Sequence, residues 1–494
     1  MNKFQLSLFA LITATVVGCG GGGGGGTAGN DNETTPVGTA TDNVVSDSGI
    51  SPAQTYIPFG SKVNPYNTLT VLAMDLNKDG VNDVVKFRSE SYDNLYIEAL
   101  INNGNGTSYT NETSKYFGKI GNAFPWVHDA HAADLNDDGL LDILPFQTSC
   151  FDTGWDGAND SCFPPMIQQA DGSFEVTSNP LLQTLRDGSY MPADIDGDGD
   201  MDIIHNNLID DHNADYPDFG GRWGGADHDR QEWEVFENRS ENGVAKYVHQ
   251  YDVFKNTPTG VGDLYTAWKA AIEFVDINGD GNLDAIIGGA RWGAPDESVE
   301  GSWFTNPVGR MSVYLGNGDF TFTYSKDSWF GDEVEAISVY RIHPADFDGD
   351  GDVDFAVTTT GEDYGAFDGE ENFMLWNTNG KLFKDTGTST THNYMGFTHM
   401  SDIADVDNDG DMDIVWWDLG GKDVRAACGD DLTNTMRVLK NNGTGSFTGT
   451  TYCLTLYQAA DGNYKNYWTM AIRMADMNGD GFVDIITGES SNCG

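Results

Sequence analysis

Basic residues are scarce in this sequence of 494 residues. It contains 26 lysines and arginines against 77 aspartates and glutamates, which gives a formal net charge of −51 at pH 7. A surface this acidic repels phosphate backbones, so nucleic-acid binding is excluded as a function class. Hydrophobic residues still make up 39% of the chain and aromatic residues 12%, which is enough for a sizeable core. The excess of acid must therefore have a local role.

Long apolar runs are also missing, except at the N-terminus, and no later stretch is apolar enough to span a bilayer. Residues 1–18 have a short basic start and an apolar run that ends at small residues, as a signal peptide does. The end of this run resembles a bacterial lipobox, which implies that Cys19 is the lipidated first residue of the mature chain. Gly20 is not the aspartate that retains many lipoproteins in the inner membrane. We therefore expect an anchor in the outer membrane of a Gram-negative bacterium, facing the periplasm or the cell surface; ordinary secretion is the alternative.

Residues 19–52 begin with an unbroken glycine run and continue with small polar residues. Glycine has the most backbone entropy to lose, so this segment is predicted to be a flexible tether for a folded part over residues 53–494.

Cysteine is rare, with six residues in the chain. An exported location permits disulfides, and the residues close in sequence suggest two pairs, Cys150 with Cys162 and Cys428 with Cys453. Cys493 is left over, and spacing alone does not establish the connectivity.

One acidic loop occurs seven times, with oxygen-bearing side chains at positions 1, 3, 5 and 9 and glycine at position 6. The predicted side-chain ligands are Asp75, Asn77, Asp79 and Asp83; Asp134, Asn136, Asp138 and Asp142; Asp194, Asp196, Asp198 and Asp202; Asp276, Asn278, Asp280 and Asp284; Asp346, Asp348, Asp350 and Asp354; Asp405, Asp407, Asp409 and Asp413; and Asp476, Asn478, Asp480 and Asp484. Ca²⁺ prefers six to eight oxygen ligands, and alternate side chains of a tight turn converge on one point. We predict up to seven bound Ca²⁺ ions, with weaker binding in the first, second, fourth and seventh loops, where asparagine replaces aspartate. The alternative is acidic turns without ions.

The loops differ from EF-hands, because position 12 is never glutamate and short β-rich runs flank them. Asn-Gly turns, as at Asn103-Gly104 and Asn442-Gly443, indicate a second hairpin in several units. Four strands in roughly 60 to 80 residues are typical of propeller blades.

These loops resemble FG-GAP and VCBS repeats, as in the β-propeller of integrin α subunits, and the resemblance covers about residues 55 to 494. It implies an all-β, seven-bladed β-propeller with a calcium loop in the first hairpin of each blade. The chain ends soon after the seventh loop, so we expect a last blade that is truncated and that borrows residues 56–60 as its outermost strand. The alternative is an N-terminal segment that supplies two strands.

The candidate residues for a ligand site lie beside the axis, on the face opposite the loops. Aromatic residues of the innermost strands stand eight residues before the first aspartate of their loops: Trp126, Trp268, Phe397 and Trp468. Polar residues stand three residues before it: His131, His343 and Arg473. These side chains could contact a sugar chain, or they could pack between blades and line a wet tunnel. An acidic insertion near residues 206–229 is a further candidate, although a solvated loop explains it as well.

Recognised catalytic motifs are missing: the sequence has no serine nucleophile elbow, P-loop, dinucleotide fingerprint or zinc motif. The leading hypothesis is a non-enzymatic calcium-binding surface lipoprotein for a glycan or protein partner. A polysaccharide-active, lyase-like enzyme that uses His131, His343 and Arg473 is the first alternative. A structural role in surface assembly is the second, since fold alone does not decide among them.

Overall fold

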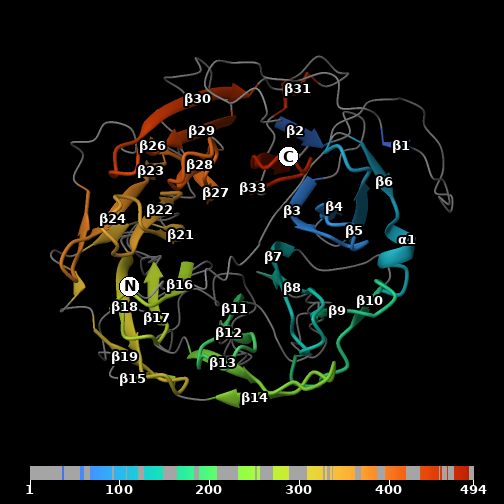
Figure 1. Ribbon diagram of the computed structural model, residues 1–494, viewed down its shortest axis with the longest axis horizontal. Coiled ribbons are helices and arrows are strands. Elements are labelled where there is room, and N and C mark those ends of the chain that lie inside the picture. Colours follow the sequence, from blue (N-terminus) through green and yellow to red (C-terminus); the bar gives the residue numbers. More distant parts are fainter. Residues whose placement is uncertain are drawn as a thin grey trace, which may run out of the picture.

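Short strands arranged in a ring around a central axis make up the described part of the chain (Figure 1). The computed structural model describes residues 36–37, 56–59, 67–91, 94–106, 108–120, 127–147, 164–182, 188–207, 232–250, 253–255, 271–288, 309–325, 329–330, 334–336, 338–361, 369–385, 395–418, 434–454, 457–458, 464–465 and 472–488. The expected all-β propeller is confirmed. Within these residues, no helix is long and apolar enough to cross a membrane.

The first repeat forms a sheet of β3 (Asn67–Met74), β4 (Asp83–Ser91), β5 (Asn94–Asn102) and β6 (Tyr109–Asn111). The two-residue strand β1 (Pro36–Val37), within the segment predicted as a tether, pairs with β6 at the edge of this sheet. A four-residue helix, α1 (Thr113–Tyr116), follows β6.

The second and third repeats share one eight-stranded sheet. It contains β7 (Val127–Ala133), β8 (Asp142–Gln147), β9 (Met166–Gln168), β10 (Phe174–Val176), β11 (Gly188–Ala193), β12 (Asp202–Asn207), β13 (Glu232–Asn238) and β14 (Tyr247–Gln250). Gly188 of β11 pairs with Gln147 of β8 and joins the two halves.

The fourth, fifth and sixth repeats each have a sheet of their own. The fourth has β16 (Ala271–Val275), β17 (Asp284–Gly288), β18 (Gly309–Gly316) and β19 (Phe322–Tyr324), with β15 (Phe254–Lys255) beside β19 and β20 (Glu335–Ala336) beside β18. The fifth has β21 (Val339–Ala345), β22 (Asp354–Thr359), β24 (Phe373–Asn377) and β25 (Leu382–Lys384). The sixth has β27 (Thr398–Ala404), β28 (Asp413–Asp418), β29 (Asn434–Lys440) and β30 (Thr448–Leu454). Two small pairs complete the strands: β23 (Glu370–Glu371) with β26 (Met395–Gly396), and β31 (Tyr457–Gln458) with β32 (Tyr464–Lys465).

The N-terminal strand β2 (Tyr56–Phe59) completes the ring by joining the seventh repeat. It pairs in parallel with β34 (Asp484–Gly488), which pairs in turn with β33 (Ile472–Ala475). We expected this segment to be the outermost strand beyond a missing third strand. The structure instead places it directly beside β34, in the position of a third strand.

The predicted number of blades was wrong. The described strands form six sheets of three or more strands, so the propeller has six blades and not seven. The physical reason is the contact between β8 and β11, because this pairing merges two sequence repeats into one continuous sheet.

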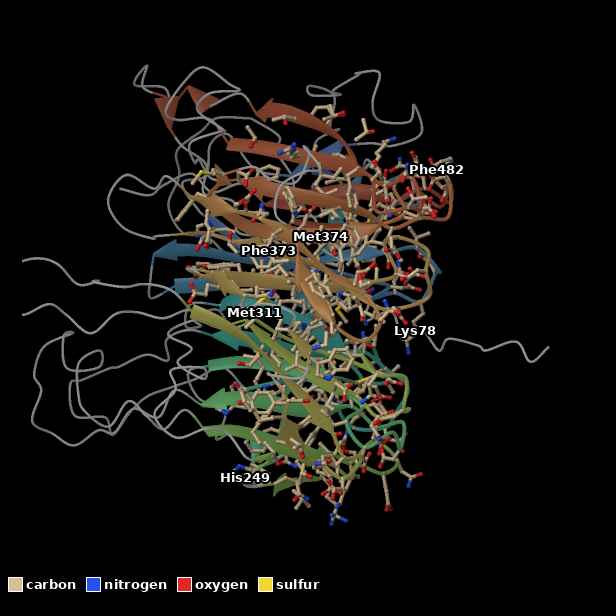
Figure 2. The ribbon with its side chains drawn as sticks, turned by 90° about the vertical axis from the view of Figure 1, so that its left-hand side faces the viewer. Lys78, His249, Met311, Phe373, Met374 and Phe482 are labelled. Carbon is tan, nitrogen blue, oxygen red and sulfur yellow. The ribbon has the colours of Figure 1, made fainter. Side chains whose placement is uncertain are left out.

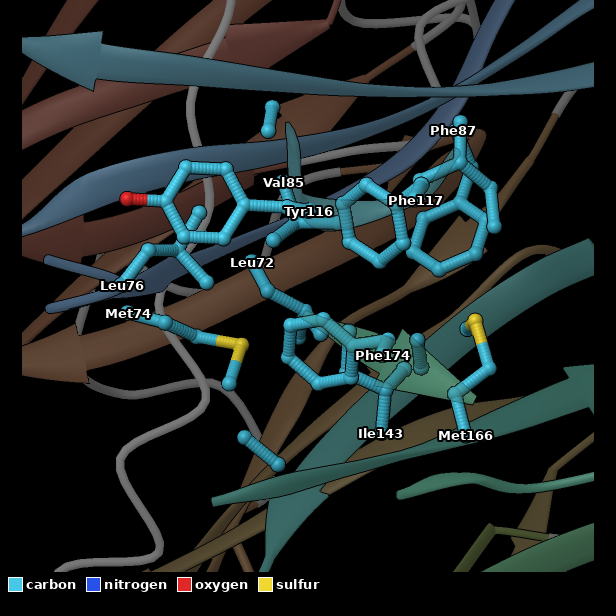
Figure 3. Packing of buried hydrophobic residues seen from close by; sticks show 14 of the residues in the cluster. Leu72, Met74, Leu76, Val85, Phe87, Tyr116, Phe117, Ile143, Met166 and Phe174 are labelled. Atoms are coloured by element: carbon cyan, nitrogen blue, oxygen red, sulfur yellow. The ribbon is translucent and has the colours of Figure 1, made fainter. Parts of the chain in front are cut away.

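Each sheet packs between two neighbours, so its middle strands are buried on both faces. All described positions of β17, β22 and β28 are buried, including the apolar residues Ile286, Val357 and Trp416. Figure 3 shows one such interface, where Leu72 and Phe87 of the first sheet pack near Phe174 of the next. The rings of Phe117 and Phe174 stack with their centroids 4.9 Å apart. Burial of each such side chain contributes about 1.5–3 kcal/mol.

Candidate functional site

The seven acidic loops connect the innermost strand of each repeat to its second strand. Position 9 of every loop is the first residue of that second strand, as Asp83 is of β4. Lys78 of the first loop and Phe482 of the seventh lie at the same end of the molecule (Figure 2). The loops therefore form one acidic face of the propeller.

Two backbone positions in the left-handed region create the tight turn. The glycine at position 6 has a φ between 79° and 100° in all seven loops, as its predicted role requires. Position 4 also has a positive φ, which the sequence reasoning missed. Glycine occupies it in four loops, and Lys78, Asp137 and Asn408 occupy it in the others.

The aspartate at position 1 organises the turn through the backbone. In every loop its Oδ2 accepts a hydrogen bond from the N–H of the glycine at position 6, over 2.7–3.1 Å. The carboxylate at position 5 similarly accepts from the N–H at position 7, as Asp79 does from Val81 over 2.9 Å. These hydrogen bonds hold the carboxylates in place at the turn without a bound ion.

The aspartate at position 9 has an additional role that the motif did not reveal. Its Oδ2 accepts from the N–H at position 2, and in the first six repeats its Oδ1 accepts from an N–H on the third strand. For Asp413 these partners are Val406, over 2.9 Å, and Asn441, over 2.7 Å. The position-2 residues are apolar and buried, as Val406 is, so they anchor each loop to the core. Position 9 therefore ties the loop to its own sheet.

Burial raises the pKa of these position-9 carboxyls, although the backbone N–H groups act in the opposite direction. The pKa is raised to about 6 for Asp83, Asp284 and Asp413, to about 7 for Asp354, and to about 8 for Asp142 and Asp202. The carboxylates at positions 1, 3 and 5 of the same loops contribute a smaller upward shift through like-charge repulsion. A divalent cation would relieve both effects.

Three loops bring carboxylate oxygens close enough together to hold a metal ion. In each of these loops one oxygen from positions 1, 3 and 9 lies within 4.8 Å of the other two; the groups are Asp194, Asp196 and Asp202; Asp346, Asp348 and Asp354; and Asp405, Asp407 and Asp413. These are the third, fifth and sixth loops, which carry aspartate at position 3. Among the described residues, the loops with asparagine there form no such group of acidic side chains.

Unsatisfied oxygens support the fit of these loops to a cation. Asn136 is 2% exposed, and its Oδ1 has no hydrogen-bond partner among the described residues. Asp194 Oδ1 and Asp407 Oδ1 are likewise buried and unpaired there. Each atom belongs to position 1 or 3 of an acidic loop. A buried acceptor without a partner is costly, and a hard cation is the ligand that would satisfy it.

A second cluster lies on the innermost strands at the axis and is centred on Asp129. Its carboxylate binds the guanidinium groups of Arg341 and Arg473, the latter over 2.6 Å, and accepts from Thr70 Oγ1 over 3.0 Å. These residues come from β7, β21, β33 and β3, so the cluster links four repeats across the axis. Burial alone would raise the pKa of Asp129, but the two arginines outweigh it and hold the pKa well below its usual range.

The predicted axial residues His131, His343 and Arg473 lie in or beside this cluster. Burial is the main cause that lowers the pKa of His131 to about 4 and that of His343 to about 3, and the arginines add to it. Both imidazoles are therefore neutral at pH 7. His343 Nε2 lies 2.8 Å from Ser401 Oγ. Sequence reasoning missed Asp129 and Arg341, which stand five residues before the first aspartate of their loops.

Comparison with known families agrees with the loop pattern. Residues 75–144 and 302–357 match a family model described as an FG-GAP-like repeat. The chain therefore contains FG-GAP-like repeats in these two regions. No curated protein matches it. The matched stretches contain the whole of the first, second and fifth acidic loops.

Several predicted sites lie outside the described residues. They are Cys19, the insertion over 208–229, the aromatic residues Trp126, Trp268 and Trp468, and the cysteines Cys150, Cys162 and Cys428; Cys453 is in β30, but its side chain is not described. Phe397 is described and is 2% exposed, with its ring 4.4 Å from that of His399. It therefore packs inside the molecule, as the alternative to a ligand site predicted.

Proposed function

We propose that this FG-GAP repeat protein is a calcium-stabilised binding module, anchored through Cys19 to the outer membrane and presenting its propeller to a glycan or protein partner. The observation that carries the proposal is the acidic face, where three loops gather carboxylate oxygens within 4.8 Å and buried oxygens lack partners. Bound Ca²⁺ would supply positive charge to loops whose predicted ligands include three or four carboxylates each.

The calcium part of the proposal is tested by thermal unfolding with Ca²⁺ and with a chelator. A ligand that binds only the folded state adds about 4 kcal/mol at a thousandfold excess over its dissociation constant, so the melting temperature should fall clearly in chelator. An equal melting temperature in both buffers would contradict the proposal.

A matched pair of variants in the fifth loop shows whether the effect arises from the ligands or from charge alone. Asp348→Ala removes a predicted ligand at position 3, and Asp352→Ala removes an exposed carboxylate at position 7 of the same loop. We expect the calcium-dependent part of the stability to shrink in the first variant only. Equal losses in both would indicate general charge repulsion.

The partner is tested by electrophoresis through gels that contain single polysaccharides, with Ca²⁺ and with chelator. Retardation without shortening of the polymer supports a glycan-binding module. No retardation across a broad panel would favour a protein partner or the structural role in surface assembly.

A lyase-like activity is the second candidate, because His131 and His343 are neutral at pH 7, as a general base must be. The same cluster also argues against it. Arg341 and Arg473 already bind Asp129, so neither is free to neutralise a substrate carboxylate. Shortened polymer in the gel experiment would favour this candidate.

A further inference from the structure

One residue of the third strand faces the acidic loop of its own repeat. In the sixth repeat this is Lys440, and in the third it is Glu237. Each directly precedes an asparagine whose N–H donates to the position-9 aspartate of its repeat over 2.7 Å. The strand register is also the same, because the residue before each pairs with the residue that follows the position-9 aspartate. The two residues are therefore structurally equivalent and have opposite charges.

Lys440 places a cation at the sixth loop. Its Nζ lies 3.3 Å from Oδ2 of Asp407, the position-3 residue, and both side chains are largely buried, with exposures of 26% and 28%. Among ion pairs between described residues, this one alone joins a lysine or arginine to a predicted calcium ligand. Asp407 Oδ1 remains buried without a partner, so the ammonium satisfies only part of the loop.

Glu237 adds negative charge at the third loop. It stands one residue before Asn238, whose N–H donates to the position-9 Asp202 of this loop over 2.7 Å. Arg239 binds both oxygens of the Glu237 carboxylate, over 2.5 and 2.8 Å, and Gln250 Nε2 donates to Oε2 over 2.5 Å. Arg239 is half exposed, so water screens its charge and it offsets that of Glu237 only in part. The third and sixth loops have identical aspartates at positions 1, 3, 5 and 9. They differ in this neighbouring charge.

Uncharged residues occupy the same position in the other repeats with a described third strand. They are Ile101, Ile167, Leu315 and Trp376. The fifth loop, which has the same four aspartates and stands beside Trp376, is thus an internal reference without a neighbouring charge.

We propose that the charge at this third-strand position sets the order in which the loops fill with Ca²⁺: the third loop first, then the fifth, and the sixth last, because Lys440 is a built-in cation that Ca²⁺ must displace. The inference rests on the proposed calcium function. Two unit charges a few ångströms apart near a protein surface interact strongly enough to change an affinity on the order of tenfold.

Hydrogen–deuterium exchange of the full chain, measured by mass spectrometry along a Ca²⁺ titration, gives each loop its own midpoint. In the wild type we expect protection of residues 194–202 at the lowest Ca²⁺ and of residues 405–413 at the highest. Lys440→Met should lower the midpoint of the sixth loop on the order of tenfold and leave the third and fifth unchanged. Glu237→Gln should raise the midpoint of the third loop alone.

Lys440→Arg and Lys115→Met are the controls. The first keeps the charge and should keep the midpoint of the sixth loop. The second removes an exposed lysine of α1, whose partner is Glu112, and should change no loop. A midpoint in Lys440→Met that is unchanged or higher than in the wild type would overturn the proposal while leaving calcium binding intact. Absence of protection by Ca²⁺ in every loop of every protein would instead overturn the proposed calcium function itself.

Discussion

The axial cluster allows a sharp prediction, because Asp129 is shared by two arginines. Asp129→Asn keeps the size of the side chain and removes its charge. The side chain of Asp129 is 3% exposed and that of Arg473 is 5% exposed, so the variant leaves Arg473 buried and without its ion-pair partner, with Asp402 as a remaining nearby carboxyl. Breaking a buried ion pair from one side costs about 3–5 kcal/mol. Arg341 is 26% exposed and can be hydrated in part, so we expect a loss of about 3–4 kcal/mol.

The assay is urea unfolding of the wild type and the variants at constant Ca²⁺. Arg473→Met should cost less than Asp129→Asn, because Arg341 still neutralises Asp129, and Arg341→Met should cost least. The triple variant Asp129→Leu, Arg341→Met and Arg473→Met should regain much of the loss, since it removes all three charges of the ion-paired cluster together. A loss below about 1 kcal/mol for Asp129→Asn, or no recovery in the triple variant, would refute the account of the cluster.

Three further predictions concern single contacts. Burial raises the pKa of Glu273 to about 8, so the stability that its neutral form supports declines as the pH rises from about 4.5 through 8. Glu273→Gln has no such group to ionise, so melts recorded against pH should show a smaller loss of stability over this range than in the wild type. Asn441→Ala removes the 2.7 Å hydrogen bond that the side-chain amide donates to the carbonyl of Phe347. This carbonyl still accepts a hydrogen bond from the N–H of Gly445, so urea unfolding should show a loss of only about 1 kcal/mol. Phe174→Ala should cost about 3–5 kcal/mol in the same assay, whereas Val176→Ala, at a 38% exposed position of the same strand, should change little.

The acidic loops could be predicted from the sequence because their geometry is local. Four oxygens and one glycine within nine residues determine the turn, and the structure has that turn at every copy. The number of blades could not be derived in this way. It depends on whether β8 and β11 form a hydrogen-bonded pair, and their residues Gln147 and Gly188 are far apart in the sequence.

The axial cluster was predicted only in part for the same physical reason. Alignment to the loops found His131, His343 and Arg473, since all three stand at one offset from their loops. Asp129 and Arg341 stand at another offset, and their importance comes from a contact across the axis between distant repeats. The repeat spacing in the sequence identifies residues at equivalent positions of different repeats. It does not show which of these residues contact one another across the axis.

Contacts between neighbouring repeats explain why ions in the loops should stabilise the whole ring. Asn441 of the sixth repeat donates to the carbonyl at position 2 of the fifth loop, and Asn102 of the first donates to Met477 at position 2 of the seventh, over 2.6 Å. The backbone N–H of each asparagine also donates to the position-9 aspartate of its own repeat. Chains of bonds therefore run from one loop, through a third strand, to the preceding loop. An ion that fixes one turn thus also supports the contact with the neighbouring repeat, which is how ions held in separate loops can each add to the stability of the whole ring.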